Sequence, residues 1–443
     1  MSAAEAPPFS TGSPGERCEQ RRFTDVACTV CGCVCDDLEI LVDQGRIIPI
    51  TGACSLAEPW FQGLNDPAAP AATIDGKTST IDAALDRAAG ILRASRNPLI
   101  FGLSRSSTPG QRAAVRLAEQ LRANIDTTAS VCHGPSIMAI QQVGESTCSL
   151  GEIRSRADLV IFWGANPVES HPRHFERYSV DPAGEFLPRG RADRTVVVID
   201  TKPTATSAAA DLFLQVPGER DFECIWTLRE LIRGISPRSD AGDNVPLAAL
   251  RDLAERMTSC RYGVVFFGLG LAQRGLGHLT VAALLQLVAE LNDHTRFTAR
   301  RLRIPGDVAG ADSVLCWQTG FPFAVNFSRG YPRYNPGEFS ADQLLTSGAV
   351  DACLVVGSES TEFLPPAARE SLARMPTVVL DYPHVVSDWQ PTVRFTTAVY
   401  GIHAQGTAYR MDETPIPLRT LLPSELPTDE VVLDALAERC REP

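Results

Sequence analysis

The chain has 443 residues, of which 44% are hydrophobic and 21% are charged. This length allows two to four domains with sizeable cores, and the composition excludes a disordered polymer. There are 53 acidic and 41 basic residues, a balance that excludes a protein whose whole surface binds nucleic acid. Because no window approaches ~18 uninterrupted apolar residues and no apolar segment follows a basic N-terminus, we expect a cytoplasmic protein without a membrane span or secretory signal.

The N-terminal part of the chain contains three segments with different sequence patterns. Residues 1–24 are polar and contain Pro and Gly, which predicts a flexible arm. Residues 36–43 alternate like a strand, and Gln44-Gly45 predicts a hairpin turn into a second strand at 46–50. The Pro/Ala-rich stretch 65–72 is typical of a linker and marks a domain boundary.

Beyond the linker, helical patterns alternate with short apolar runs. The expected helices cover 80–94, 109–122, 219–235 and 281–292, and the expected strands cover 98–103, 159–163, 195–199, 212–216, 263–267, 354–356 and 378–380. Strands that alternate with helices favour α/β architecture with parallel, doubly wound sheets, and the length favours two of them.

Thirteen cysteines are present, and in a reducing compartment they do not form a disulfide framework. Cys28, Cys31 and Cys35 follow the spacing C-x2-C-x3-C, and Cys54 comes after a gap of 18 residues. Four thiolates from one loop and one returning segment suit a cubane iron–sulfur cluster. A structural zinc site and a loop of metal-free buried cysteines are the alternatives.

A second cysteine motif is Val131-Cys132-His133-Gly134, which precedes a helix-like segment. A cysteine at a strand-to-helix turn can ligate a metal or act as a nucleophile. The adjacent histidine can transfer a proton. A thiol that is simply packed in the core is the alternative interpretation.

Two glycine turns follow apolar strands. Gly164 and Asn166 come after the first, and Gly268 and Gly270 come after the second. Ligands approach the backbone at the carboxyl ends of parallel strands, so these four residues are candidate cofactor-binding positions. An ordinary structural turn is the alternative, because the second turn lacks the full dinucleotide pattern.

Two histidines and one arginine complete the candidates. His171 and His174 are spaced for a ligand pair, although the intervening Pro172 favours a turn with hydrogen-bonded histidines. The segment 317–338 is rich in aromatic residues, Gly and Pro, which indicates an ordered lining or interface loop. Its Arg329 can hold a carboxylate or an oxyanion, or else lie on the surface without a ligand.

Five segments together resemble the B subunit of formylmethanofuran dehydrogenase. The resemblance runs from about residue 25 to 420, and the cysteine cluster is shared with the wider molybdopterin oxidoreductase superfamily. The long aromatic loop and the His-Pro-Arg-His sequence are the specific parts. The matching segments are 28–37, 131–135, 166–179, 317–338 and 406–412.

The resemblance implies a small N-terminal cysteine-cluster domain and two doubly wound α/β domains. The implied boundaries are an arm at 1–24, a 4Fe-4S-type domain at 25–75, an α/β domain built from 76–145 and 300–405, an inserted α/β domain at 146–299 and an extension at 406–443. Superfamily enzymes end in a β-barrel domain, for which the extension is too short, so we expect another subunit to supply it.

The resemblance also implies a set of site residues. Cys28, Cys31, Cys35 and Cys54 match the ligands of a 4Fe-4S cluster. Cys132 matches the protein ligand of a tungsto- or molybdopterin guanine dinucleotide, and His133 matches a proton-transfer histidine. An arginine belongs to the same active site, and Arg303 and Arg329 are both candidates. The family reaction reduces carbon dioxide to formate, or runs the reverse, while other subunits handle the formyl group.

One departure separates two branches of the family. Superfamily members follow the fourth cluster cysteine with a lysine, but here Cys54 is followed by Ser-Leu-Ala-Glu, and the chain's two lysines, Lys77 and Lys202, lie elsewhere. We therefore favour a structural subunit of a bacterial formyltransferase/hydrolase complex that converts a formyl group to formate and need not carry the cofactors. An active tungsten- or molybdenum-pterin dehydrogenase subunit is the alternative. Either interpretation implies partner subunits, and neither implies nucleic acid or a membrane.

Overall fold

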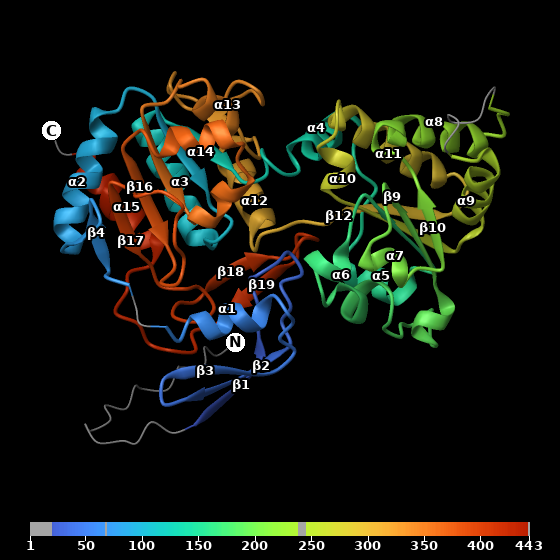
Figure 1. The fold of residues 1–443 in the computed structure, drawn as a ribbon, viewed down its shortest axis with the longest axis horizontal. Coiled ribbons are helices and arrows are strands. Elements are labelled where there is room, and N and C mark those ends of the chain that lie inside the picture. Colours follow the sequence, from blue (N-terminus) through green and yellow to red (C-terminus); the bar gives the residue numbers. More distant parts are fainter. Residues whose placement is uncertain (1–19, 67–68, 238–244, 442–443) are drawn as a thin grey trace, which may run out of the picture.

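A computed structural model describes residues 20–66, 69–237 and 245–441 of the chain. A small sheet lies below two α/β bodies that stand side by side (Figure 1). The small sheet has the antiparallel order β1 (Arg21–Val26), β2 (Leu38–Asp43), β3 (Arg46–Thr51). The hairpin turn predicted at Gln44-Gly45 is confirmed, with both residues at positive φ.

The predicted arm lies largely outside the described residues, but its C-terminal end does not match the prediction. Residues from Arg21 onward form β1, which pairs with β2 through Phe23 and Ile40. Most of β1 is exposed and polar, so its sequence carries no apolar alternation that would reveal a strand. Pairing with the more apolar β2 gives it order.

The larger sheet has nine strands, and its central five are parallel. Antiparallel strands extend it at both edges. Its order is β14 (Arg333–Tyr334), β13 (Val325–Asn326), β7 (Asn124–Thr127), β6 (Pro98–Gly102), β15 (Ala352–Val356), β16 (Thr377–Asp381), β17 (Val393–Thr396), β4 (Ala72–Ile74), β5 (Lys77–Thr78).

Helices cover both faces of the nine-stranded sheet. On one face the buried side chains come from α2 (Ile81–Ala94), α3 (Thr108–Leu121), α12 (Val308–Thr319) and α15 (Asp429–Arg439). On the other face they come from α13 (Ala341–Thr346) and α14 (Pro366–Leu372).

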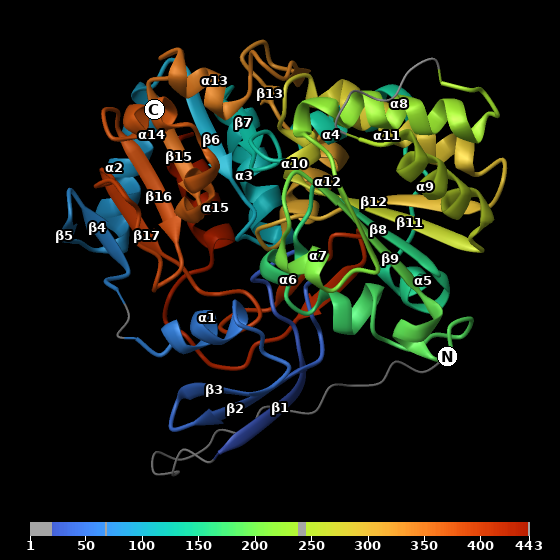
Figure 2. The same ribbon diagram turned by 45° about the vertical axis from the view of Figure 1, so that its right-hand side comes forward.

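The second sheet has five strands, all parallel. Its order is β10 (Leu212–Gln215), β9 (Thr195–Asp200), β8 (Leu159–Trp163), β11 (Tyr262–Phe267), β12 (Arg296–Arg301). One face is covered by α4 (Gly134–Val143), α8 (Asp221–Ile232), α9 (Leu247–Ser259) and α11 (Gly277–Leu291). Figure 2 shows this body beside the nine-stranded one.

The opposite face of the five-stranded sheet shares one hydrophobic cluster with the cysteine loop and the small sheet. The π-helix Phe175–Ser179 and α5 (Leu150–Arg156) contribute to this cluster. The remaining elements are short: α1 (Ala57–Gly63), α6 (Pro167–Ser170), α7 (Ala205–Ala208), α10 (Leu269–Ala272), the hairpin β18 (Gly406–Tyr409) and β19 (Pro415–Leu418), and the 3-10 turns Gly190–Asp193, Gly218–Arg220 and Ser358–Phe363.

The predicted fold class is confirmed: two doubly wound sheets accompany a small N-terminal sheet. The chain crosses between the two bodies twice, at residues 128–133 after β7 and at residues 302–307 after β12. No helix within the described ranges is long and apolar enough to cross a membrane.

The strand order of the five-stranded sheet reverses between β8 and β11, and the two predicted glycine turns meet at this point. The backbone amide of Gly270 donates to the carbonyl of Gly164 at 3.1 Å. A Cβ on Gly268 would lie 2.5 Å from the same carbonyl oxygen. Glycine is therefore needed here because two loops pack backbone against backbone.

We expect Gly268→Ala to destabilise the full chain by about 1–3 kcal/mol, the usual cost of forcing atoms into a packed site. Gly90→Ala in α2 is the matched control, because nothing lies within 4 Å of its added Cβ and alanine favours a helix by about 1 kcal/mol over glycine. Urea unfolding measures both. Equal midpoints for the two variants would contradict the packing explanation.

Candidate active site at the double crossing

The two crossings are joined by His133. Its Nε2 donates to the carbonyl of Leu302 at 2.9 Å, and its Nδ1 lies 3.0 Å from the hydroxyl of Ser136. Because a carbonyl only accepts, the proton sits on Nε2, and Nδ1 accepts from Ser136. Burial lowers the pKa of His133 well below its usual value, and nearby Arg303 and Arg301 lower it further. The imidazole is neutral, and both ring nitrogens are engaged.

Cys132 lies against a buried ion pair. The guanidinium of Arg303 donates to Asp312 Oδ2 at 2.5 Å, and its positive charge acts on the Cys132 thiol. Asp312 Oδ1 accepts from the Thr127 hydroxyl at 2.8 Å. Burial raises the pKa of Cys132 to about 11, although Arg303 acts in the opposite direction. The Nε–H of Arg303 is buried and has no hydrogen-bond partner within the described part of the chain.

The structure brings only one of the two candidate arginines to Cys132. Arg303 is 2% exposed and lies in the second crossing, two residues after the end of β12. Arg329 is exposed in the loop between β13 and β14, and no hydrogen bond or ion pair joins it to another described residue. Because residues 296–301 were not predicted as a strand, no sequence pattern put Arg303 at the carboxyl edge of a sheet.

The cluster-type cysteines gather around one small cavity. Cys28, Cys31 and Cys35 are buried and Cys54 is half-buried, and all four line the cavity with Cys33 between them. The loop is closed by the Cys28 amide, which donates to the Cys35 carbonyl at 2.7 Å.

This arrangement bears on the kind of metal group the loop could hold. Among the described residues, no three His, Cys, Asp or Glu side chains converge on a single ion. Thiols that surround a space suit a polynuclear cluster, whose ligands sit at separate corners. Four cysteines around one cavity supply the thiol donors that the predicted cluster requires.

The backbone of Arg303 connects this pocket to Cys132. Its carbonyl accepts from the Gly32 amide at 3.1 Å and from His171 Nε2 at 2.9 Å. A Cβ on Gly32 would lie 2.3 Å from the same oxygen, so only glycine permits this approach. One residue therefore presents its side chain to Cys132 and its backbone to the cysteine loop.

A cavity of about 310 Å³ opens beside the cysteine loop. Cys31, Arg105, Glu169, Ile304 and Glu359 line it, among others. Ile304 directly follows Arg303, so the second crossing forms part of the cavity wall. Its volume suits a small organic ligand.

The predicted cofactor-binding histidines lie in the interior. His171 donates to the backbone as described, and burial lowers its pKa to about 4. His174 Nδ1 lies 2.9 Å from the Ser179 hydroxyl, and its ring meets Phe266 edge to face. Burial lowers the pKa of His174 to about 3. Neither histidine lines the cavity beside the cysteine loop.

Asn166, the remaining cofactor-binding candidate, uses its side-chain oxygen within the protein. This oxygen accepts from the Thr206 amide at 3.2 Å and from the Thr206 hydroxyl at 2.6 Å. The contact fixes the loop after β8 to α7. A ligand role for Asn166 and for the glycines stays a prediction.

The chain is similar to proteins of one family. It is 37% identical over 428 residues to the B subunit of tungsten-containing formylmethanofuran dehydrogenase 2 of Methanocaldococcus jannaschii, covering 94% of this chain and 98% of the relative. It is 28% identical over 292 residues to the B subunit of the formyltransferase/hydrolase complex Fhc of Methylorubrum extorquens, covering 65% of this chain and 75% of the relative. No family model matches the chain.

Two solved structures share the fold. The formyltransferase/hydrolase complex FhcABCD from Methylorubrum extorquens with methylofuran matches with a TM-score of 0.68 and 25% identity, over 84% of this chain and 99% of that chain. Acetylene hydratase from Pelobacter acetylenicus matches with a TM-score of 0.66 and 11% identity, over 95% of this chain and 69% of that chain. The second likeness concerns the fold alone.

The chain is a doubly wound α/β protein that shares its fold with one chain of FhcABCD and with acetylene hydratase. Within that class, the chain belongs to the family of formylmethanofuran dehydrogenase B subunits. The match to the Fhc B subunit and to the FhcABCD structure supports the predicted relation to the bacterial branch.

The buried histidines make stability depend on pH. His174 has a pKa of about 3 when folded and about 6.5 when unfolded, so its contribution is present above pH 6.5 and is lost as the pH falls toward 3. Between pH 7 and 5 this loss is about 2 kcal/mol for a histidine that stays neutral in the fold. We expect His174→Phe to reduce the loss by about that amount.

Urea unfolding of the full chain at pH 7 and pH 5 measures this effect. His294→Phe is the control, because His294 is exposed. If His174→Phe and the unmodified chain lose equal stability between the two pH values, His174 is not a buried neutral histidine.

Proposed function

We propose that this chain is the B subunit of a multi-subunit complex of one-carbon metabolism that handles a formyl group on a furan-type carrier. The observation that carries this proposal is the match over 99% of one chain of the FhcABCD complex, whose structure contains methylofuran. The 37% identity to a formylmethanofuran dehydrogenase subunit supports the same conclusion.

Within this complex, the first candidate role is that of a structural subunit in a bacterial formyltransferase/hydrolase complex that releases the formyl group as formate. Two features support it. The chain matches the Fhc complex in fold, and no basic residue follows Cys54 in the segment 55–58. In this role the cysteines pack as small buried residues.

The second candidate role is that of a dehydrogenase subunit that holds a 4Fe-4S cluster and a tungsten or molybdenum pterin guanine dinucleotide. Two different observations favour it. The four predicted cluster cysteines line one cavity. Near Cys132, the buried Arg303 has an N–H without a partner among the described residues, and this donor is available to an anionic group.

When bound, these cofactors supply two-electron chemistry at a one-carbon group and a path for the electrons. Cys28, Cys31, Cys35 and Cys54 would hold the cluster, and Cys132 would hold the pterin's metal.

The chain's own residues then have distinct tasks. Arg303, fixed by Asp312, would orient formate or a developing oxyanion through a charge-assisted hydrogen bond. His133 commits its Nε2–H to Leu302, so a proton reaches or leaves its ring through Nδ1 and the Ser136 hydroxyl. His133 also positions the crossing that carries Arg303.

We further propose that another subunit supplies the β-barrel of the superfamily fold. Supporting this, the chain is similar to one chain of the multi-subunit complex FhcABCD. We place the complex in the cytoplasm.

Metal analysis of the complex purified without oxygen separates the two roles. The dehydrogenase role predicts about four iron atoms per chain, as one cubane cluster requires, and about one tungsten or molybdenum atom held through Cys132. Cys31→Ala should lose iron, whereas Cys353→Ala, a buried cysteine in β15 far from the pocket in sequence, should keep it. Cys132→Ser should lose tungsten or molybdenum and keep iron.

The structural role predicts a colourless complex in which all three variants assemble and transfer formyl groups at the same rate as the unmodified chain. A complex that neither contains metal nor binds a furan-carried formyl group would contradict the proposed function as a whole.

A further inference from the structure

We propose that Arg105 provides the positive charge beside the cysteine pocket that the segment after Cys54 lacks, and that this charge raises the reduction potential of the bound cluster. The inference rests on the dehydrogenase candidate. Arg105 follows β6, which makes it distant from the cysteine loop in sequence.

Arg105 is fixed directly to the cysteine loop. Its Nη1 donates to the carbonyls of Thr29 at 2.9 Å and Val30 at 3.2 Å, the two residues between Cys28 and Cys31. Its side chain is 11% exposed. A guanidinium with two backbone acceptors in a nearly buried setting has one defined position, so its charge acts on the cysteine pocket at short range.

Close packing at Gly306 holds this arrangement. A Cβ on Gly306 would lie 2.7 Å from the Thr29 carbonyl oxygen, 2.8 Å from the Ser104 carbonyl oxygen and 3.4 Å from Arg105 Nη1. Gly306 also has a φ of +34°. The cysteine loop, the end of β6 and the second crossing therefore meet at one point, with the guanidinium inside it.

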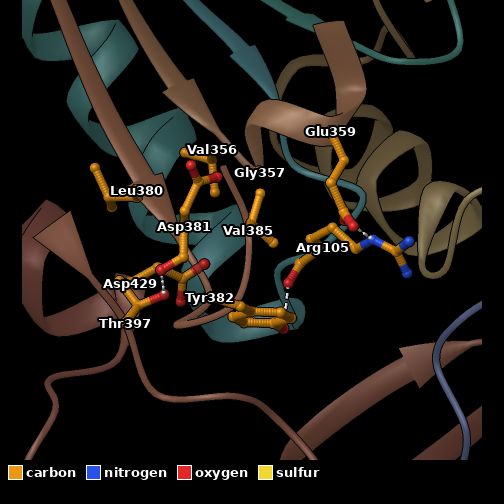
Figure 3. Close-up of a pocket in the computed structure, with 10 residues that line it drawn as sticks. All are labelled: Arg105, Val356, Gly357, Glu359, Leu380, Asp381, Tyr382, Val385, Thr397 and Asp429. Carbon is orange, nitrogen blue, oxygen red and sulfur yellow. Dashed lines mark hydrogen bonds and ion pairs between the residues drawn. The ribbon is translucent and has the colours of Figure 1, made fainter. Parts of the chain in front are cut away.

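The other side of Arg105 is anchored to the nine-stranded sheet (Figure 3). Its Nε donates to Glu359 Oε2 at 2.6 Å, and its backbone carbonyl accepts from the Tyr382 hydroxyl. The guanidinium points away from Tyr382 and Asp381. Arg105 and Cys31 both line the 310 Å³ cavity, and Cys31 also lines the cysteine pocket.

Two other arginines approach the pocket from the side of Cys35, but carboxylates neutralise them. These two guanidiniums share three acidic partners: Arg173 pairs with Asp37 and Glu176, and Arg177 pairs with Asp36 and Asp37.

Arg105 is balanced by fewer carboxylates than this pair. It faces one, Glu359, which binds its Nε edge while Nη1 binds the cysteine loop. Arg173 lines the pocket near Cys35, whereas Arg105 is the cation that acts on its other side, at Cys31.

The physical consequence concerns the potential of the cluster. Reduction adds an electron to a group that already carries negative charge from its thiolates, so a nearby positive charge stabilises the reduced form. Removing the charge of Arg105 leaves Glu359 uncompensated and should make the cluster harder to reduce. Removing the charge of Glu359 should make it easier to reduce.

The test uses the whole complex, purified without oxygen, with Arg105→Gln, Arg105→Lys and Glu359→Gln. Arg116→Gln is the control, because Arg116 forms an exposed ion pair with Asp434 on the surface. Iron content and the midpoint potential, followed by the electron paramagnetic resonance of the reduced cluster, are measured for each. Neither quantity depends on turnover.

We expect Arg105→Gln to shift the midpoint potential to a more negative value. Arg105→Lys keeps the positive charge, so its midpoint potential should stay close to that of the unmodified complex. Glu359→Gln should shift the midpoint potential to a more positive value. Arg116→Gln should match the unmodified complex. If Arg105→Gln does not fold, the Glu359→Gln variant still tests the inference, because a midpoint potential that does not become more positive would contradict it.

Two outcomes overturn the inference in distinguishable ways. Iron-loaded variants with unchanged potentials would show that Arg105 does not act on the cluster, and would leave the dehydrogenase role intact. An unmodified complex without iron would remove the dehydrogenase role and the role of Arg105 together.

Discussion

The hydrogen bonds to the backbone carbonyls of Leu302 and Arg303 determine how the rest of the site is arranged. His133 donates to the first, and Gly32 and His171 donate to the second. These donors come from three separate segments: the other crossing, the cysteine loop and the turn after β8. If this short stretch moved, Cys132 would lose its arginine and the cysteine loop would lose its support.

Burying the ion pair formed by Arg303 and Asp312 costs a large desolvation free energy. Taking two charges out of water costs several kcal/mol per ion, and their attraction offsets this only with good geometry and further hydrogen bonds. Here the Thr127 hydroxyl donates a hydrogen bond to the second carboxylate oxygen of Asp312, but Arg303 Nε has no partner among the described residues. If only packing were needed beside Cys132, apolar residues of similar volume could replace the ion pair without loss of stability. The proposed dehydrogenase role gives this buried charge a ligand to bind.

The architecture and the cysteine pocket could be predicted from the sequence. Apolar runs such as 159–163 and 263–267 are buried on both faces of a parallel sheet, and their periodicity has no competing explanation. Strand β12 was not predicted because its sequence contains arginines. Packing in the folded protein buries them, and Glu413 pairs with Arg300 there. The choice between Arg303 and Arg329 depended on that strand. Arg105 escaped for a similar reason, since its approach to the cysteine loop depends on how the end of β6 packs against the second crossing.

The position of the glycine turns could be predicted from the sequence, but their role in packing two loops together could not. They lie at the reversal of strand order, because parallel strands end at a common edge. Their immediate purpose is packing, since Gly164, Gly268 and Gly270 allow two loops to touch. The same glycines are compatible with a ligand, but loop packing alone already accounts for them.

Arg303 links the cysteine loop, through its backbone carbonyl, to the surroundings of Cys132, and we propose that the two regions form one site. An experimental density map of the complex, purified and frozen without oxygen, tests this arrangement most directly. The dehydrogenase role predicts continuous density from the sulfurs of the four predicted cluster cysteines into a cluster, density for a pterin metal at Cys132, and the Arg303 carbonyl still bonded to Gly32. A pocket closed by protein side chains, with Arg303 turned away from Cys132, would contradict it.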